Sequence, residues 1–151
     1  MLFRPTPSVL LVEDNSDDEA LCRRALRLEV PGVRVRVLSD GQAAVDEVAA
    51  IQADETCPLP DLILLDFKLP KLTGLEVLEH IRSRKCTKRL PIVLFSSSSE
   101  QGGIDAAYEA GVNTYVVKPI DYEEYVTTVR LIARYWFGVA HPPRLRTCVE
   151  N

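Results

Sequence analysis

Short apolar runs alternate along this chain with longer segments that have helical spacing. Residues 9–12, 62–65, 92–95 and 114–117 are rich in apolar side chains, which is typical of strands that are buried on both faces of a parallel sheet. Between residues 33 and 38, valines alternate with Arg34 and Arg36. This strand is therefore expected to have one less covered face.

A helical segment follows each of these strands. The predicted segments are residues 16–29, 40–52, 73–81, a stretch that stops at Gly111, and 121–136. Ser16 and Glu19 have the spacing of a capping box, as do Thr73 and Glu76. Because strand and helix alternate five times, we predict an α/β fold. Its doubly wound, five-stranded parallel sheet should have the order 2-1-3-4-5, with helices on both faces.

Polar residues stand where four of the predicted strands end. Glu13 and Asp14 follow the first strand, Asp66 follows the third, Ser96 ends the fourth, and Lys118 follows the fifth. The ends of parallel strands lie on one edge of the sheet, and strands one and three are neighbours at the switch point where ligands bind. Three carboxylates are therefore expected to meet in one crevice.

Such a carboxylate group favours a hard cation. Close carboxylates repel one another unless a cation is present or some of their pKa values rise. Oxygen ligands that remain open to water suit Mg²⁺ or Mn²⁺ better than zinc. We therefore expect a metal site at Glu13, Asp14 and Asp66, with the backbone carbonyl of Lys68 as a further ligand.

A phosphoryl group on Asp66 would explain the remaining strand-end residues. Aspartate carboxylates are nucleophiles that form aspartyl phosphate, and phosphoryl transfer depends mostly on positioning and charge neutralisation. Lys118 supplies a second positive charge and Ser96 a hydroxyl. Taken singly, a strand-end serine is usually a turn residue and a lysine before proline a solvated charge. The prediction therefore depends on finding all of these residues, in this order, in one chain.

Three other functions fit the sequence less well. A phosphatase with an aspartyl nucleophile needs a second acid two residues later, where this chain has Lys68. A flavin or nucleotide binder needs a Gly- or hydroxyl-rich loop after the first strand, but residues 13–18 are largely acidic and repel phosphate. A calcium loop of the EF-hand type starting at Asp14 would have Glu19 in place of its glycine and Ala25 in place of its final acid.

At these positions the chain resembles the receiver domain of two-component response regulators. The matching motifs are residues 11–15 (Leu-Val-Glu-Asp-Asn), 64–70 (Leu-Leu-Asp-Phe-Lys-Leu-Pro) with Gly74, Ser96, and 115–119 (Tyr-Val-Val-Lys-Pro). The resemblance covers about residues 8–136. It implies a flavodoxin-like fold and a phosphorelay signalling switch, which is not an enzyme beyond slow autodephosphorylation.

The resemblance also implies the metal site and the source of the phosphate. Asp66 would accept phosphate from a histidine kinase, with Mg²⁺ held by four groups: Glu13, Asp14, Asp66 and the carbonyl of Lys68. Glu13 stands where many family members have Asp. Its longer arm would shift a water ligand without abolishing metal binding. The serine loop and the aromatic end of the last helix resemble single-domain regulators that serve phytochrome-type kinases, so a bacteriophytochrome is an expected partner.

Three further roles follow from the resemblance. Ser96 and Tyr115 would be paired switch residues, and Lys118 would contact the phosphate. The peptide bond before Pro119 would be cis. Phosphate on Asp66 would draw in Ser96 and let Tyr115 turn inward, changing the face formed by the fourth helix, the fifth strand and the last helix.

Composition limits the partners. The chain has 151 residues and a net charge of -4, which fits one domain without a general attraction to nucleic acid or to an anionic membrane. We expect a lead over residues 1–7, a receiver domain over 8–136 and a tail over 137–151, too short for a DNA-binding domain. The four cysteines lack the clustering of a zinc site or a disulfide framework.

The surface and the ends of the chain give two further expectations. No apolar run is long enough to cross a bilayer, and the N-terminus lacks a signal-peptide core, so a cytoplasmic location is expected. Apolar residues beyond the core stripe of the last helix, namely Leu131, Tyr135, Trp136 and Phe137, predict a homodimer through the face described above.

Overall fold

The computed structural model describes residues 6–53, 58–143 and 145. The strands are β1 (Ser8–Val12), β2 (Arg34–Leu38), β3 (Leu62–Leu65), β4 (Ile92–Ser96) and β5 (Thr114–Val117). The helices are α1 (Ser16–Glu29), α2 (Gly41–Ala53), α3 (Gly74–Arg82), α4 (Gln101–Glu109), α5 (Tyr122–Arg134) and the π-helical turn η1 (Tyr135–Val139). All strand pairings are parallel, in the order β2-β1-β3-β4-β5, which confirms the predicted topology.

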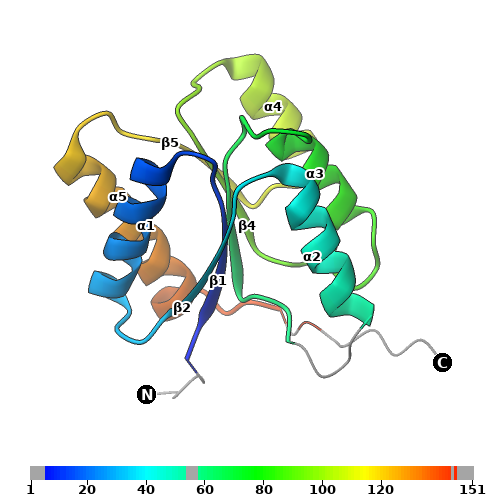
Figure 1. Cartoon of the computed structure of the whole chain (residues 1–151), viewed down its shortest axis with the longest axis horizontal. Helices are drawn as coiled ribbons and strands as arrows, with labels where there is room; N and C mark the ends of the chain where they lie inside the picture. Colours follow the sequence, from blue (N-terminus) through cyan, green and yellow to red (C-terminus); the bar gives the residue numbers. More distant parts are fainter. Residues whose placement is uncertain (1–5, 54–57, 144, 146–151) are drawn as a thin grey trace.

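The sheet lies between two layers of helices. Figure 1 shows α1 and α5 on one face and α2, α3 and α4 on the other. In β3, Leu62 and Leu64 pack toward α1 and α5, whereas Ile63 and Leu65 pack toward the other helices. All four side chains are fully buried. The unbroken apolar run therefore reflects a strand that needs an apolar residue at every position.

The edge strand β2 explains the alternating pattern seen in the sequence. Its Arg34 and Arg36 are exposed, while the residues between and after them are half-buried. Arg36 forms an ion pair with Glu47 of α2. Charged residues on an edge strand discourage pairing with another chain, so the alternation marks the sheet boundary.

Two helix caps were predicted from capping boxes, and one of them is wrong, although both helices are present. Thr73 and Glu76 form the reciprocal bonds of a capping box at α3, as predicted. At α1 the cap is Asn15 rather than Ser16, because Asn15 is extended and its Oδ1 accepts the N–H groups of Asp17 and Asp18, both at 3.0 Å. Ser16 is already the first helical residue.

Three further expectations need correction. The predicted cis bond before Pro119 is absent, because no peptide bond in the described part of the chain is cis. The cis and trans forms of an X–Pro bond differ in free energy by only about 0.5–1 kcal/mol, so sequence alone does not fix the isomer. Cys86 is disulfide-bonded, although the wide spacing of the cysteines argued against it. The last helix extends beyond Trp136 as η1, where Trp136 and Phe137 pack against the core.

The guanidinium of Arg82 ties loops together at the sheet edge where β4 and β5 begin. It donates to the carbonyls of Leu90 at 2.7 Å, Gly111 at 2.8 Å and Thr87 at 3.2 Å, and to Asn113 Oδ1 at 2.9 Å. This edge lies opposite the carboxyl ends of the strands.

Over the described residues, we find no helix with both the length and the apolar character needed to cross a bilayer.

Candidate functional site

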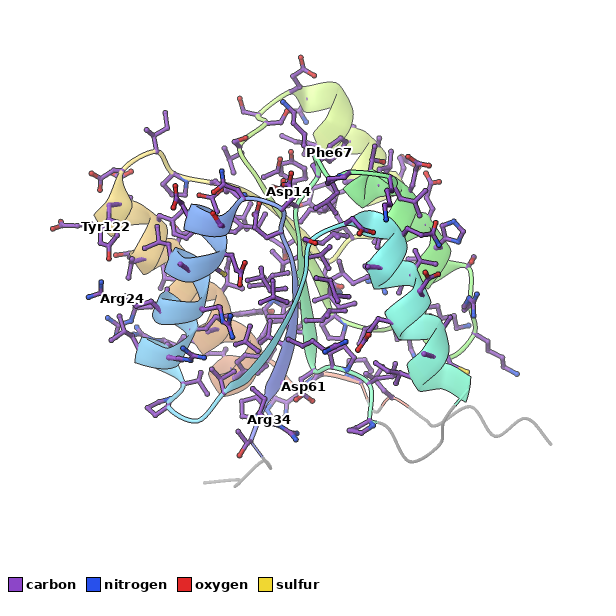
Figure 2. All side chains as sticks on the ribbon, viewed as in Figure 1. Asp14, Arg24, Arg34, Asp61, Phe67 and Tyr122 are labelled. Carbon is purple, nitrogen blue, oxygen red and sulfur yellow. The ribbon has the colours of Figure 1, made fainter. Side chains whose placement is uncertain are left out.

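The loops at the carboxyl ends of β1 and β3 bring the predicted acids together. Val12 and Leu65 are partners in the sheet, so the residues that follow them leave the sheet side by side. The N–H of Asp66 donates to the carbonyl of Val12 at 3.0 Å. Figure 2 shows Asp14 and Phe67 near this end of the sheet, and Arg34 and Asp61 near the opposite end.

The three acids lie close enough together to share one cation. Glu13, Asp14 and Asp66 each place one carboxylate oxygen within 4.8 Å of the others. Glu13 and Asp66 are buried, whereas Asp14 is exposed. An all-oxygen donor set with one side open to water fits Mg²⁺ or Mn²⁺, which retain water ligands. The predicted convergence is therefore present in the structure.

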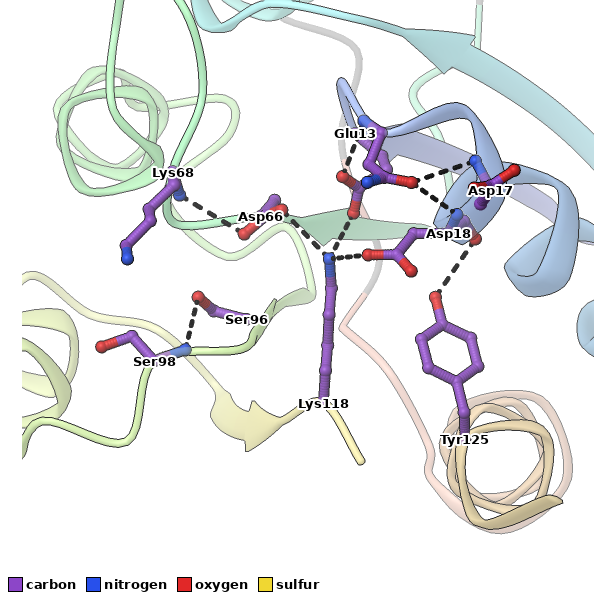
Figure 3. A network of polar contacts seen from close by, with 10 residues as sticks. Glu13, Asp17, Asp18, Asp66, Lys68, Ser96, Ser98, Lys118 and Tyr125 are labelled. Carbon is purple, nitrogen blue, oxygen red and sulfur yellow. Dashed lines mark hydrogen bonds and ion pairs between the residues drawn. The ribbon is translucent and has the colours of Figure 1, made fainter. Parts of the chain in front are cut away.

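Lys118 makes three ion pairs with carboxylates at this site. Its Nζ lies 2.6 Å from Glu13 Oε2, 3.0 Å from Asp66 Oδ2 and 3.0 Å from Asp18 Oδ2 (Figure 3). The predicted contact partner of a phosphoryl group thus already lies beside the predicted acceptor. Asp18 was not singled out from the sequence. The available signal was its place in the first turn of α1, directly after the loop that carries Glu13 and Asp14.

Burial and charge act in opposite directions on the pair formed by Glu13 and Lys118. Burial raises the pKa of Glu13 to about 7, although the hydrogen bond from Lys118 opposes this shift. Burial alone would lower the pKa of Lys118, but its bonds to Glu13 and Asp18 and the charge of Asp66 raise it overall. The proton that the pair shares therefore stays on Lys118, and the ammonium neutralises part of the acidic charge.

The backbone holds Asp66 closely. The Oδ1 of Asp66 accepts the N–H of Lys68 at 3.3 Å. The N–H of Gly74 donates to the carbonyl of Phe67 at 2.8 Å, and a Cβ built on Gly74 would lie 2.2 Å from the carbonyl oxygen of Asp66. A glycine at this point lets the start of α3 approach the Asp66 backbone.

The predicted switch residues meet at the turn that follows β4. Ser96 is fully buried, and its Oγ accepts the N–H of Ser98 at 3.3 Å. The hydroxyl of Tyr115 donates to the carbonyl of Ser98 at 2.7 Å. The Tyr115 ring lies against Phe67, with 6.4 Å between ring centroids, and its N–H donates to the hydroxyl of Tyr108 at 3.1 Å. Ser96 and Tyr115 are therefore linked through Ser98.

Two aromatic residues that the sequence did not predict as part of the site, Phe95 and Tyr125, lie near Lys118. The Lys118 ammonium lies 5.8 Å from the centroid of Phe95, and the rings of Phe95 and Tyr125 are 5.1 Å apart. Tyr125 is 4% exposed, and its hydroxyl donates to the backbone carbonyl of Asp18 at 3.2 Å. Tyr125 is part of the buried core on the α1 and α5 side of the sheet.

Comparison with known proteins identifies a matching family and several relatives. A family model described as the response regulator receiver domain matches residues 9–130. The probable methanogenesis regulatory protein FilR2 of Methanothrix harundinacea is 37% identical over 136 residues, which cover 89% of this chain and 86% of FilR2. The response regulator Rcp1 of Synechocystis is 34% identical over 139 residues, which cover 92% of this chain and 95% of Rcp1.

Solved structures resemble the fold over nearly its whole length. The phosphorylated cyanobacterial phytochrome response regulator RcpA has a TM-score of 0.84 and 33% identity, covering 93% of this chain and 100% of RcpA. The Mn²⁺-bound form of Rcp1 has a TM-score of 0.83 and 33% identity, covering 91% of this chain and 99% of Rcp1.

Proposed function

This chain belongs to the family of response regulator receiver domains, and on that premise we propose that it accepts a phosphoryl group on Asp66 from a histidine kinase. The observation that carries the proposal is the meeting of Glu13, Asp14 and Asp66 beside the Lys118 ammonium. RcpA is a phytochrome response regulator, so a phytochrome-type kinase is the partner we expect. The chain then acts as a signalling switch rather than as an enzyme.

The residues present divide the work of phosphoryl transfer. A carboxylate oxygen of Asp66 attacks phosphorus, the bond from phosphorus to the donor nitrogen breaks, and the donor imidazole keeps the electron pair and takes a proton from water. Mg²⁺ held by Glu13, Asp14, Asp66 and the Lys68 carbonyl would neutralise charge between the acceptor and the incoming phosphoryl oxygens. Mn²⁺ binds Rcp1, which supports this assignment.

Lys118 and Ser96 would hold the product. The Lys118 ammonium is 3.0 Å from Asp66 Oδ2 and pairs with a phosphoryl oxygen once the phosphate is attached. The Ser96 hydroxyl donates to another oxygen. Because Ser96 now accepts the N–H of Ser98, its movement would shift the Ser98 carbonyl that holds Tyr115. Tyr115 already lies against Phe67, so the switch we propose changes this existing contact instead of starting with an inward turn.

Phosphorylation tests the proposal directly. Wild type and Asp66→Asn would be incubated with acetyl phosphate and Mg²⁺, with a chelator as the control, and their intact masses compared. We expect one phosphoryl group on wild type only, and only with Mg²⁺. A mass gain in both proteins, or in neither, would refute the assignment of Asp66.

The output surface we propose is the face formed by α4, β5 and α5. Each of these elements has a large exposed apolar side chain: Tyr108, Val117 and Leu131. Exposed apolar residues favour a protein interface, so we propose that this face forms a homodimer and does not contact DNA. Trp136 and Phe137, first expected in this surface, pack instead against the core.

The dimer can be tested by light scattering with a matched pair of substitutions. Leu131→Arg should give a monomer, whereas Leu28→Arg, at a similarly exposed position on α1, should remain a dimer. A monomeric wild type at high concentration, with and without phosphorylation, would argue against the dimer. So would equal behaviour of the two variants.

A further inference from the structure

Asp18 is the ion-pair partner of Lys118 that lies outside the candidate cation site. Glu13 and Asp66, the other two partners, are also members of the acidic trio that fits a divalent cation. Their oxygens cannot give the same strength of interaction to an ammonium and to a divalent cation at once, because the two positive charges repel at short range. Asp18 is 3.0 Å from Lys118 Nζ and has no such divided role.

A closed series of contacts fixes the position of Asp18. Its carboxylate pairs with Lys118, the ammonium lies over Phe95, and the Phe95 ring contacts Tyr125. The Tyr125 hydroxyl then returns to the Asp18 backbone carbonyl at 3.2 Å. The N–H of Asp18 is also held by the Asn15 cap at 3.0 Å. The first turn of α1, β4 and α5 thus hold the lysine that follows β5.

We propose that Asp18 is a positioning residue that keeps the Lys118 ammonium beside Asp66 when Glu13 and Asp66 bind a divalent cation. This inference rests on the proposed function, in which Lys118 pairs with the phosphoryl group on Asp66. Without Asp18, the metal-free site still has Glu13 and Asp66 as partners for Lys118. In the metal-bound site, loss of Asp18 would remove the partner of the Lys118 ammonium that does not also bind the cation.

The proposal therefore predicts that Asp18 matters more with the cation than without it. Loss of the Asp18 charge should weaken cation binding, because Lys118 then stays on the oxygens that the cation needs. It should also release the ammonium from a fixed position once the cation is bound. A carboxylate that acts only through its charge would give the first effect without the second.

Asp17 provides a matched control. Asp17→Asn and Asp18→Asn each remove one acid from the first turn of α1, so their effects on the helix dipole and the net charge are the same. Asp17 is exposed, and within the described residues it is not among the ion-pair partners of Lys118. Differences between the two variants therefore report the contact with Lys118.

Two measurements on the full chain test the proposal without phosphorylation. Electron paramagnetic resonance of free Mn²⁺ gives the dissociation constant, which we expect to be about fivefold higher in Asp18→Asn than in Asp17→Asn, as for the loss of one partly exposed ion pair. The ammonium signal of ¹⁵N-labelled Lys118, recorded with saturating Mg²⁺, should persist in wild type and in Asp17→Asn. It should broaden beyond detection in Asp18→Asn.

Equal Mn²⁺ affinity of the two variants would overturn the proposal, and so would weaker Mn²⁺ binding with an unchanged Lys118 signal. If Asp18→Asn does not fold, Tyr125→Phe takes its place, because it keeps the ring on Phe95 and removes the bond to the Asp18 backbone. It should change both measurements in the same direction, and no change would also overturn the proposal. Failure of the proposed function appears separately, as a wild type that takes no phosphoryl group from acetyl phosphate.

Discussion

Replacing Gly74 with alanine should displace the backbone of Asp66 in the candidate site. Gly74 begins α3, and its missing side chain faces the backbone of Asp66. A Cβ there would lie 2.2 Å from the Asp66 carbonyl oxygen and 2.8 Å from the Cα of Phe67, below the 3.0 Å that real Cβ contacts respect. Both neighbours are backbone atoms, so no side chain can rotate away to make room.

The expected magnitude follows from two opposing effects. Alanine is better than glycine in a helix by about 0.5–1 kcal/mol, so helix propensity alone predicts a more stable protein. Relief of the overlap requires the chain at Asp66 to move by about 1 Å, and overpacking of this kind costs about 1–3 kcal/mol. We therefore expect a net loss of stability. We also expect at least about tenfold slower phosphorylation, because a displacement of this size misaligns a reacting group.

Urea denaturation gives the stability change, and intact mass during reaction with acetyl phosphate and Mg²⁺ gives the rate. Gly102→Ala in α4 is the control, because a Cβ there meets no atom within 4 Å. This control should gain about 0.5 kcal/mol from helix propensity and keep the wild-type phosphorylation rate. The reasoning fails if Gly74→Ala is as stable as wild type and is phosphorylated at the same rate.

Two other predictions concern the pH dependence of metal binding and the opposite edge of the sheet. Burial raises the pKa of Glu13 to about 7. Below that pH the carboxyl is mostly protonated, so it must release a proton before it can bind a cation. The Mg²⁺ dissociation constant should rise by about tenfold per pH unit below that pKa. Calorimetry on wild type and Glu13→Gln tests this, and an equal pH dependence in both proteins would contradict it. Arg82→Lys should lower the free energy of unfolding, measured by urea denaturation, by about 2–3 kcal/mol, because the carbonyl acceptors of Arg82 lose their donor. A loss below about 0.5 kcal/mol would show that water replaces the guanidinium.

The sheet and its acidic edge were predictable because each depends on local patterns joined by a topological rule. An apolar run such as residues 62–65 indicates a doubly covered strand, and parallel strands bring Asp14 and Asp66 to one edge whatever the details of packing. The acidic trio within 4.8 Å confirms that inference.

Asp18 could not be assigned in the same way, because its role depends on how the first turn of α1 is rotated. That rotation is set by the Asn15 cap, which the sequence reading placed one residue later. The exposure of apolar residues was also hard to predict, since helical periodicity fixes their spacing but not the direction of the buried stripe. Leu28 is 52% exposed, while Cys22, Ala25 and Leu26 form the buried face of α1.

The bond from the Tyr115 N–H to the Tyr108 hydroxyl has a consequence for assembly. β5 is the last strand on its side of the sheet, where an open amide can recruit a strand from another molecule. Here the hydroxyl from α4 occupies that amide at 3.1 Å. A second molecule that meets this side would have to dock through side chains, because strand addition at Tyr115 would first require α4 to release its tyrosine.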